Sequence, residues 1–411
     1  MTRILTECAV CAGDIETFLD LGESPLANKL PQTVDDKEDF IPLQVAVCTT
    51  CWLVQQTYVP AAADVFEDDY SFYSGTSPAL VAHHKTRAQE LLKLFPQQAR
   101  RLTLEVACND GDLLRHFQEA GCRTLGVDPA VGPVEVARER GLTVWLTSFD
   151  VNVAAEIRNT HGPVGLLIAN HVVAHVEDLV GFMTAVRSAL ARDGVASLEF
   201  QYLPDLLLGN QLDHVYHEHR YYLSLTALKF VCDQVGLDVI DARRVSPQGG
   251  SLQVTLAIRG DGTYPAQDPG ISRRLLSERW LRQSESYHGT QGRAEYLRTR
   301  LQDELAEAWK IGSVAGYGMP AKAATLLNFC GIGPDTLTHI IDSTPHKIGR
   351  LSPGMKIPIV GLGDRPDPVT YLLFVWNYRG TVIQREVNFI KNGGRFIIPI
   401  PVPLTTKALG G

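Results

Sequence analysis

The sequence predicts an α/β protein in which a small cysteine-rich domain precedes two units of alternating strands and helices. Two CxxC pairs lie within the first 51 residues. Five strand-like segments alternate with helix-like segments between residues 102 and 203, and a second alternating series follows residue 310. Because strands that alternate with helices form parallel sheets with helices on both faces, we expect two doubly wound units.

The composition is typical of a globular protein with more than one domain. The chain has 411 residues, of which 45% are hydrophobic and 20% are charged, and this length indicates two or three domains. Lysine and arginine number 38 against 46 aspartate and glutamate residues, which gives a formal charge of −8. Because a nucleic-acid polymer favours a basic partner, we expect none here. The N-terminus lacks the apolar core of a signal peptide and no apolar run approaches a membrane span, so we expect a cytoplasmic protein without a membrane partner.

Four of the eight cysteines form the two CxxC pairs, Cys8 with Cys11 and Cys48 with Cys51. In a large chain without an export signal, such pairs indicate metal binding rather than disulfides. Four thiolates from two tight turns can make the closed tetrahedral site that zinc prefers, and a closed site leaves no position for a substrate. We therefore expect a structural Zn²⁺ in a domain that covers residues 1–68.

The first alternating series predicts a central domain over residues 69–260. A helix-like run covers about residues 77–94, and the expected strands lie near residues 102–109, 122–128, 142–149, 162–170 and 195–203. The segment 259–270 is rich in Pro, Gly and Asp, which is typical of a linker. A charged helical stretch and the second alternating series follow, so we expect a smaller C-terminal domain over residues 261–411.

The turn after the first expected strand has the position of a cofactor-binding turn. Doubly wound domains bind ligands at the carboxyl ends of the strands, beside this turn. In EVACNDGD, Glu105 is followed at alternate positions by Ala107, Asn109 and Gly111. Enzymes that use S-adenosylmethionine commonly have an acid followed by glycines here, but only Gly111 is a glycine in this chain. The pattern alone therefore does not decide the cofactor.

Further residues at this edge favour S-adenosylmethionine over a dinucleotide. Asp128, 17 residues after Gly111, ends the second strand where a carboxylate can accept hydrogen bonds from ribose hydroxyls. Asp110 puts negative charge where a dinucleotide would place its pyrophosphate, which suits a cationic sulfonium better, although a helix cap is the alternative. Phe149 is placed to cover the adenine, with ordinary core packing as the alternative. Asn170 ends the fourth strand, where the methionine end of the cofactor should reach.

Histidines and a tyrosine are concentrated at the same edge of the sheet. The fourth strand runs into His171 and His175, and the chain beyond the fifth strand reaches YHEH, residues 216–219. Removing a proton next to a carbonyl requires a base of suitable pKa and donors that stabilise the oxyanion. Histidine is the natural base near neutral pH, so the pattern predicts proton transfer beside the cofactor. We expect His214 and His217, in contrast, to be polar surface.

Segments distributed along the whole chain match one enzyme family. They are CAVC with CTTC, YSFYSGTSP, EVACNDGDLL, NHVVAHV, VYHEHRYYLS, QGGSLQV, GYGMPAKAATLLN and IIDSTPHKIGRLSPGMKIPI. With these segments the sequence resembles the sugar C-methyltransferases that act on nucleotide-linked keto-deoxysugars in antibiotic biosynthesis. The resemblance implies a zinc domain, a central Rossmann-like S-adenosylmethionine domain, and a C-terminal Rossmann-like domain that helps to hold the substrate. That substrate is expected to be a dTDP-linked 4-keto-deoxysugar.

The resemblance also implies roles for individual residues. His219 is the expected base that removes the proton α to the ketone. Tyr216, Glu218 and His175 are expected to position the sugar and to stabilise the enolate. Tyr70, from YSFYSG, is expected to reach in beside them.

Three further positions bear on the binding sites. Lys322, from GYGMPAK, is expected to pair with the diphosphate of the substrate, with a solvated helix lysine as the alternative. The family usually has a glycine where this chain has Ala107, so a methyl group is added close to the cofactor. It usually has an uncharged residue where this chain has Arg220, which bears on the shape and charge of the sugar pocket.

Three other functions remain open at the level of sequence. In the late segment, Gly316, Gly318 and Ala321 fit GxGxxA after a strand, and Asp342 lies 24 residues beyond Gly318, so a nicotinamide-dependent sugar-nucleotide oxidoreductase is one alternative. A sugar O-methyltransferase with the same cofactor is a second, because a base can also deprotonate a hydroxyl. A zinc-containing scaffold protein with a degenerate cofactor site is a third.

Overall fold

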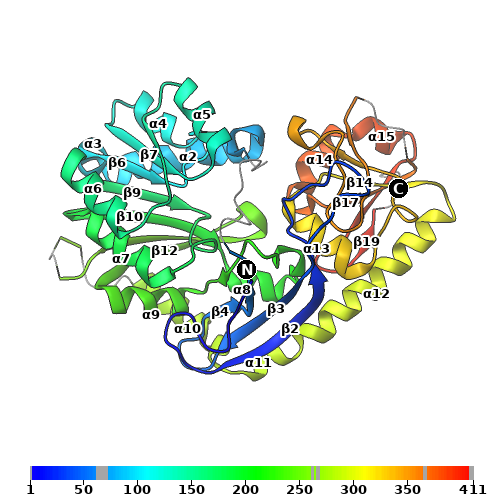
Figure 1. Cartoon of the computed structure of the whole chain (residues 1–411), viewed down its shortest axis with the longest axis horizontal. Coiled ribbons are helices and arrows are strands. Elements are labelled where there is room, and N and C mark those ends of the chain that lie inside the picture. Colours follow the sequence, from blue (N-terminus) through cyan, green and yellow to red (C-terminus); the bar gives the residue numbers. More distant parts are fainter. Residues whose placement is uncertain (1, 62–72, 261–262, 265–268, 364–367, 407–411) are drawn as a thin grey trace.

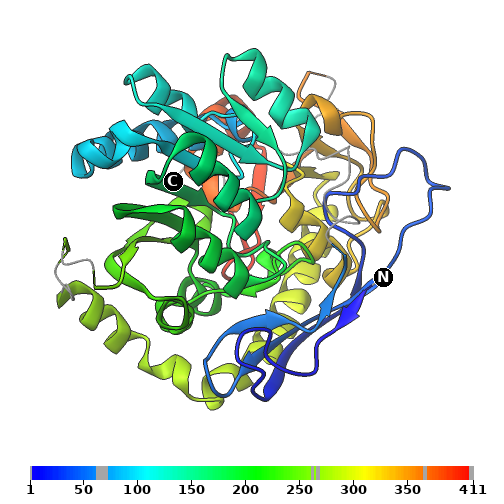
Figure 2. The same ribbon diagram turned by 60° about the vertical axis from the view of Figure 1, so that its left-hand side comes forward.

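Three domains make up the molecule, and the computed structural model describes residues 2–61, 73–260, 263–264, 269–363 and 368–406. The central domain, cyan and green in Figure 1, stands beside the C-terminal domain, orange and red, with the blue N-terminal sheet below them. The 20-residue helix α12 (Thr290–Trp309) packs on this sheet and on the C-terminal domain, as Figures 1 and 2 show from two sides.

The central domain is built on a seven-stranded sheet of order β12–β13–β10–β9–β6–β7–β8. The strands from β10 to β8 are parallel to one another. β6 and β9 are buried along almost their whole length, as expected of parallel strands that are covered on both faces. The strands are β6 (Thr103–Val106), β7 (Thr124–Asp128), β8 (Val144–Leu146), β9 (Val164–Asn170), β10 (Leu190–Gln201), β12 (Leu237–Val245) and β13 (Ser251–Ile258).

Helices cover both faces of this sheet. Leu166 and Ile168 of β9 pack in one apolar cluster with α2 and α4, whereas Leu167 and Ala169 pack in another with α6, α7 and α9. Successive side chains of a strand point to opposite faces, so each face has its own helices. The doubly wound arrangement expected from the sequence is therefore confirmed. The helices are α2 (Pro78–Leu94), α3 (Pro96–Arg101), α4 (Leu114–Glu119), α5 (Val131–Glu139), α6 (Val151–His161), α7 (Leu179–Ala189), α8 (Leu203–Leu208) and α9 (Leu225–Val235).

The sheet has two strands more than the five expected from the sequence. β12 and β13 form a hairpin, and β13 is antiparallel to both β12 and β10. The charged segment that follows the expected linker begins with α10 (Pro269–Ser277), which packs against β12 and α9 of the central domain. Its continuation, η4 (Arg279–Arg282) and α11 (Glu285–His288), leads into α12.

The N-terminal domain is an antiparallel sheet of order β11–β4–β3–β2. Three of its strands come from the first segment of the chain: β2 (Ile15–Ser24), β3 (Ile41–Cys48) and β4 (Val54–Gln56). The fourth, β11 (Tyr221–Tyr222), follows the YHEH motif and pairs with β4. A short pair, β1 (Arg3–Ile4) with β5 (Tyr58–Val59), completes the domain. The YHEH segment is thus bound directly to the N-terminal sheet.

The C-terminal domain is the second α/β unit expected from the sequence. Its sheet has the order β16–β15–β14–β17–β18–β19 and is parallel except for β19. Its strands are β14 (Val314–Tyr317), β15 (Ile340–Asp342), β16 (Ile359–Gly361), β17 (Thr370–Leu373), β18 (Arg395–Ile398) and β19 (Leu404–Thr405). Its helices are α13 (Ala321–Cys330), η5 (Pro345–Lys347), η6 (Trp376–Tyr378), α14 (Arg379–Arg385) and α15 (Val387–Lys391).

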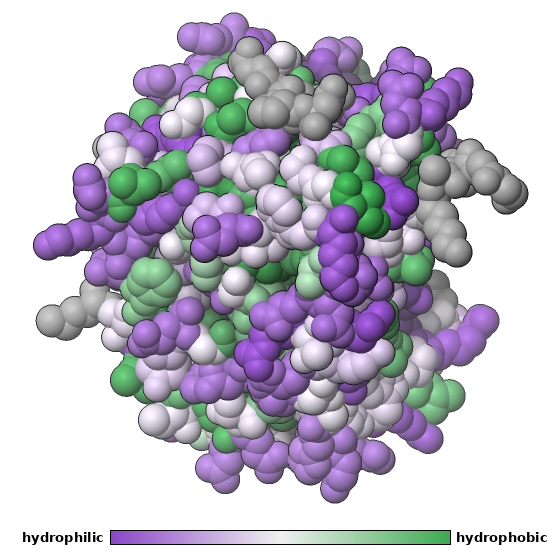
Figure 3. All heavy atoms as spheres, turned by 90° about the vertical axis from the view of Figure 1, so that its right-hand side faces the viewer, coloured by the Kyte–Doolittle hydropathy of each residue, from purple (hydrophilic) through white to green (hydrophobic). Residues whose placement is uncertain are grey.

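The outer surface of the C-terminal side is largely polar. Figure 3 shows hydrophilic and intermediate side chains over most of this face, with hydrophobic side chains in small separate groups. Among the described residues, none of the helices combines the length and the apolar character that crossing a bilayer would require.

Candidate active site

The four cysteines of the CxxC pairs converge at one end of the N-terminal sheet. Their sulfur atoms all lie within 4.8 Å of one another. The Sγ atoms of Cys8 and Cys51 are 3.5 Å apart, and so are those of Cys11 and Cys48. Zinc with four sulfur ligands at about 2.3 Å places those ligands about 3.8 Å apart, so this donor set fits a tetrahedral zinc ion.

The turn after β6 is held in an unusual backbone conformation. Ala107 and Asn109 have φ values of +54° and +53°, and Gly111 has +74°. A Cβ atom at Gly111 would lie 2.1 Å from Leu142 Cδ1, so the glycine is required by packing as well as by its φ. Asn109 donates its backbone N–H to Asp128 Oδ2 at 2.8 Å, which ties this turn to the end of β7.

Two candidate cofactor residues have buried polar atoms without a partner among the described residues. They are Oε2 of Glu105 and both amide atoms of Asn170. Glu105 pairs in register with Ile168 of β9, so Asn170 stands beside the turn that follows β6. Burial, reinforced by Asp112 and Asp128, raises the pKa of Glu105 well above its usual range. Unpaired buried polar groups at this edge fit a polar ligand such as S-adenosylmethionine.

Two other candidate cofactor residues, Asp128 and Asp110, already form hydrogen bonds within the protein. Asp128 accepts backbone N–H groups from Asn109 and Ala130, both at 2.8 Å, which leaves lone pairs for a ribose. Asp110 accepts the hydroxyl of Ser74 at 2.6 Å and lies 3.3 Å from Arg140, so its carboxylate faces protein partners.

The aromatic candidate, Phe149, is half-buried. It meets Phe182 edge to face, with ring centroids 5.9 Å apart. This contact explains why part of the Phe149 ring is buried. Its contact with the adenine of the cofactor stays a prediction.

The histidine loop, residues 214–220, contains a hydrogen-bonded tyrosine–histidine pair. The Tyr216 hydroxyl is 2.7 Å from Nε2 of His219, and Nδ1 of His219 is 2.9 Å from the carbonyl of His214. A carbonyl can only accept, so Nδ1 carries the proton and Nε2 accepts from the tyrosine. The His175 ring is 4.9 Å from the His219 ring, and its Nδ1 donates to the carbonyl of Glu218 at 2.8 Å.

Burial controls the charges of this loop. It lowers the pKa of His219 well below its usual range and that of His175 to about 4, so both imidazoles are neutral at pH 7. Burial raises the pKa of Glu218 to about 7, although hydrogen bonds from Asn28 oppose the shift. The loop therefore offers neutral imidazoles that can accept a proton.

His214 and His217 are buried, 4% and 1% exposed, and the expectation that they are polar surface is wrong. His217 Nε2 is 3.3 Å from the carbonyl of Pro42 in the N-terminal domain. The His214 ring meets Trp376 of the C-terminal domain edge to face, at 5.8 Å between centroids. Both histidines thus pack between domains, which local sequence does not reveal.

The histidine loop lies at the same edge of the central sheet as the cofactor turn. β9 is the neighbour of β6, and the chain leaves β9 directly into His171–His175. Arg220 then donates its N–H to the carbonyl of Ala174 at 2.7 Å. The structure thus brings His175, Tyr216, Glu218 and His219 together after β9, the strand next to the one that precedes the turn with the candidate cofactor residues. Tyr70 lies outside the described residues.

Lys322 is buried, 5% exposed, at the junction of the central and C-terminal domains. Its Nζ donates to Asn377 Oδ1 at 3.0 Å, lies 3.6 Å from Asp213, and stands 3.9 Å from the centre of the Trp376 ring. Trp376 in turn donates its indole N–H to Asp213 at 2.6 Å. The lysine is therefore not a solvated helix residue, and its pairing with a diphosphate stays a prediction.

Neighbouring side chains pack closely against Gly316 and Gly318 of the late glycine motif. Cβ atoms at Gly316 and Gly318 would lie 2.8 Å from Ile340 and Val375, respectively. Asp342 accepts the backbone N–H groups of Met319 at 2.6 Å and of Thr344 at 2.8 Å. The dinucleotide-like spacing thus has a structural explanation within the domain.

Sequence reasoning missed several residues that contact the histidine loop. No local pattern marks them, because their partners lie far along the chain. They are Asn28, Gln56 and Trp376. The charge of Lys347 also acts on Glu218 and lowers its pKa.

Comparison with protein families accounts for almost the whole chain. A zinc binding domain model matches residues 8–66, a methyltransferase domain model matches residues 81–242, and a C-methyltransferase C-terminal domain model matches residues 246–401. The three matches follow the order of the N-terminal, central and C-terminal domains.

Several solved structures are similar to part of the chain. Magnesium protoporphyrin IX methyltransferase from Synechocystis, with bound SAM, is 14% identical and has a TM-score of 0.34, with 44% of this chain and 82% of that chain covered. The PH0226 protein from Pyrococcus horikoshii is 16% identical with a TM-score of 0.37, over 46% of this chain and 95% of that chain. These similarities are distant and cover less than half of this chain. A curated relative, in contrast, matches its full length.

That relative is the C-methyltransferase NovU of Streptomyces niveus, which is 33% identical over 420 residues, or 99% of this chain and 98% of NovU. The four-cysteine cluster and the methyltransferase domain agree with zinc and S-adenosylmethionine as the cofactors. The chain belongs to the family of S-adenosylmethionine-dependent C-methyltransferases that carry an N-terminal zinc domain.

Proposed function

We propose that this enzyme methylates the carbon α to the ketone of a nucleotide-linked 4-keto-deoxysugar, with dTDP as the expected nucleotide, in natural-product deoxysugar biosynthesis. The observation that carries the proposal is the Tyr216–His219 pair, in which Nε2 of His219 carries no proton. The loop that contains the pair lies at the same edge of the central sheet as the turn with the candidate cofactor residues. The sugar and its nucleotide are supported by the motifs that resemble sugar C-methyltransferases.

The residues divide the reaction into proton removal and stabilisation of charge. The His219 imidazole accepts a proton, directly or through the Tyr216 hydroxyl, from the carbon next to the ketone. The electron pair left on that carbon forms an enolate, whose oxygen needs hydrogen-bond donors such as tyrosine. His175 and Glu218 flank the pair and position the sugar.

S-Adenosylmethionine, when bound, supplies an electrophilic methyl group. The candidate residues of this chain for its binding are Glu105, Ala107, Asn109, Asp110, Gly111, Asp128, Phe149 and Asn170. Among them, Glu105 and Asn170 have buried polar atoms without a partner among the described residues. Each Asp128 oxygen accepts one backbone N–H and has a further lone pair for a ribose hydroxyl. Bound there, the cofactor would supply the methyl group to the enolate carbon, and this transfer would require no second base.

The product identifies the reaction. The enzyme is incubated with S-adenosylmethionine and a set of dTDP-linked 4-keto-deoxysugars, and the product is examined by mass and proton spectra. We expect one added methyl group as a resonance of a methyl on carbon, with loss of one proton α to the ketone. An O-methyl product with both α protons retained would overturn the proposal in favour of a sugar O-methyltransferase.

A further inference from the structure

The histidine loop is physically continuous with the N-terminal zinc domain. Directly after the loop, β11 pairs with β4, so that Tyr221 faces Gln55 and Tyr222 faces Val54. The backbone N–H of Gln56 donates to the carbonyl of Arg220 at 3.0 Å. Because β4 follows Cys51 by only two residues, the zinc site and the loop are joined through one short strand.

Gln56 holds the residue that forms half of the tyrosine–histidine pair. It is fully buried, and its Nε2 donates to the carbonyl of Tyr216 at 2.6 Å. The same carbonyl accepts the backbone N–H of His219 at 2.8 Å. One carbonyl thus fixes Tyr216, His219 and Gln56 relative to one another, and removal of the amide would leave it short of a buried partner.

Asn28 contacts the carboxyl group of Glu218, the residue that precedes His219 in the chain. It lies in the segment between β2 and β3, and its Nδ2 donates to Glu218 Oε2 at 2.6 Å. The charged and titratable groups that face Glu218 are Lys347 of the C-terminal domain and, at its backbone carbonyl, His175. Asn28 is therefore the neutral donor that orients this buried side chain.

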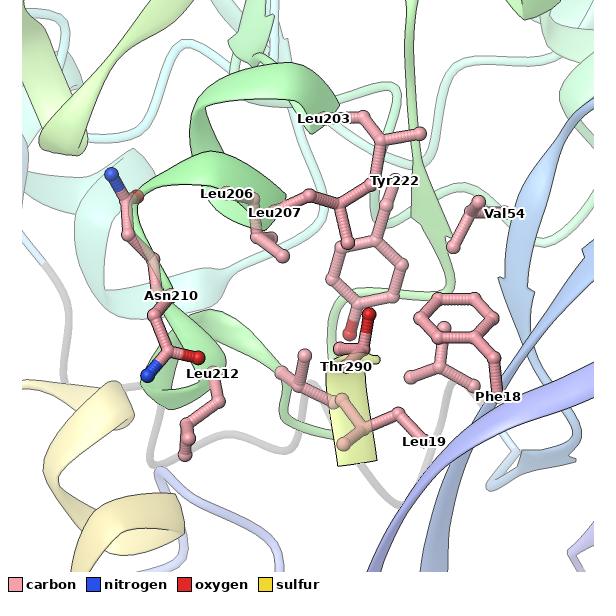
Figure 4. A pocket seen from close by; sticks show the side chains of 13 residues that line it. Phe18, Leu19, Val54, Leu203, Leu206, Leu207, Asn210, Leu212, Tyr222 and Thr290 are labelled. Carbon is pink, nitrogen blue, oxygen red and sulfur yellow. The ribbon is translucent and has the colours of Figure 1, made fainter. Parts of the chain in front are cut away.

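Apolar side chains pack around Tyr222, two residues beyond the loop. Figure 4 shows the ring of Tyr222 among Phe18 and Val54 of the N-terminal sheet and Leu203 and Leu206 of α8. The pocket at this point has a volume of about 10 Å³, room for at most one water molecule. The apolar contacts of Tyr222 therefore leave almost no free space between the end of the loop and the N-terminal sheet.

We infer that Asn28 and Gln56 are positioning residues for the methyl transfer, through which the N-terminal domain orients Glu218 and Tyr216. The inference rests on the proposed function. It gives the zinc domain a part in the reaction: the domain sets the geometry of groups that act on the substrate, although its own zinc site is closed to substrate. Neither residue acts on the reacting atoms itself.

The test uses the full-length zinc-loaded enzyme with Gln56→Met and Asn28→Asp. Methionine keeps the volume of Gln56 without its donor, and aspartate keeps the shape of Asn28. Gln98→Met is the matched control, because Gln98 donates to the carbonyl of Asp193 at 3.3 Å and to Tyr264 at 3.1 Å, away from the histidine loop. The measurements are kcat, KM, the dissociation constant of S-adenosylhomocysteine, and hydrogen–deuterium exchange of peptides that span residues 214–222.

In Gln56→Met and Asn28→Asp, we expect kcat to fall about ten- to a hundredfold, because small misplacements of reacting groups cause losses of this size. Binding of S-adenosylhomocysteine should stay within about twofold of wild type, because cofactor residues are untouched. Exchange in the 214–222 peptides should be faster in Gln56→Met only. In Asn28→Asp, a second carboxylate beside Glu218 should raise its pKa and move the acidic limb of kcat/KM to higher pH, which a purely structural defect would not do.

Wild-type kcat in both variants, or equal losses in Gln98→Met, would overturn the inference. If the wild-type enzyme methylates none of the keto-sugar nucleotides, the proposed function fails separately. The exchange of the 214–222 peptides then decides the inference: faster exchange in Gln56→Met than in Gln98→Met supports it, and equal exchange overturns it.

Discussion

At the scale of single residues, hydrogen bonds determine which atom of His219 can act. The carbonyl of His214 accepts from Nδ1, and this contact directs the unprotonated Nε2 at the Tyr216 hydroxyl. Burial keeps the imidazole neutral by lowering its pKa. Tyr216 and His219 therefore form one hydrogen-bonded pair, the base of the proposed reaction. The motif alone could not indicate this pair, because it does not specify side-chain directions.

We expect His219→Ala to lose about a hundredfold to ten-thousandfold in kcat, the range that general bases contribute. Binding of S-adenosylhomocysteine should survive, because the cofactor turn is built from other residues. Turnover assays and calorimetric titration measure the two effects, with the exposed His288→Ala as the control. Near wild-type turnover in His219→Ala would show that another group is the base.

His217 should make the stability of the fold depend on pH. Burial lowers its pKa from 6.5 to about 4, so the fold favours the neutral form. The stability that this contributes is present above pH 6.5 and is lost as the pH falls towards 4, by about 3 kcal/mol. In urea unfolding at pH 7 and pH 4, His217→Asn should lose correspondingly less stability than wild type, and His288→Asn should behave as wild type. Equal losses in all three proteins would contradict the assignment.

At the scale of elements, the sequence predicted those whose partners are close along the chain. The strand–turn–helix pattern of β6 and α4 and the helix α2 are local features, and both are found where expected. β11 was not predicted, because a two-residue strand is specified only by its pairing with the distant β4. The β12–β13 hairpin was missed as well, because no α-helix separates its two strands.

Glu278 also connects elements that lie far apart along the chain. It is completely buried and accepts the Tyr202 hydroxyl at 2.6 Å together with the N–H groups of Leu225 and Thr226 at 2.9 and 2.7 Å. It thereby connects the start of α9 to the end of β10.

Glu278→Ala should lower the free energy of unfolding by about 3 kcal/mol, because several buried donors lose their acceptor. Urea unfolding measures the effect. Glu307→Ala is the control, because Glu307 pairs with Lys310 and both side chains are 68% exposed, so its loss should cost less than about 1 kcal/mol. Equal losses in the two variants would contradict the role given to Glu278.

At the scale of the whole molecule, the histidine loop lies where all three domains meet. Asn28 and Gln56 contact it from the N-terminal domain, and Thr325 donates to the carbonyl of Val215 from the C-terminal domain at 2.7 Å. The order of the domains could be predicted from the sequence, because cysteine spacing and strand–helix alternation are local. Their contacts could not be predicted, because Lys322 and Asp213 become neighbours only in the folded chain.

Loss of a zinc ligand should lower the stability of the whole N-terminal sheet. Cys48→Ser removes one of four sulfur ligands, and a structural zinc contributes folding free energy, so the N-terminal sheet should be destabilised. Zinc content by mass spectrometry and thermal unfolding measure the effect, with Cys122→Ser, outside the cluster, as the control. A zinc-free variant with the wild-type unfolding midpoint would contradict a structural zinc.

The most direct test of the account measures exchange of the α hydrogen of a dTDP-linked 4-keto-deoxysugar. The enzyme, the sugar and S-adenosylhomocysteine are incubated in D₂O, and proton spectra record the loss of the α-hydrogen signal. Without a methyl donor, the carbanion formed in the proposed reaction takes a proton back from the Tyr216–His219 pair. Deuterium enters the sugar once this pair has exchanged its proton with D₂O. We predict exchange well above the spontaneous rate with the wild-type enzyme, and the spontaneous rate with His219→Ala. Wild-type enzyme that methylates the sugar but leaves the α hydrogen at the spontaneous rate, or exchange that persists in His219→Ala, would contradict it.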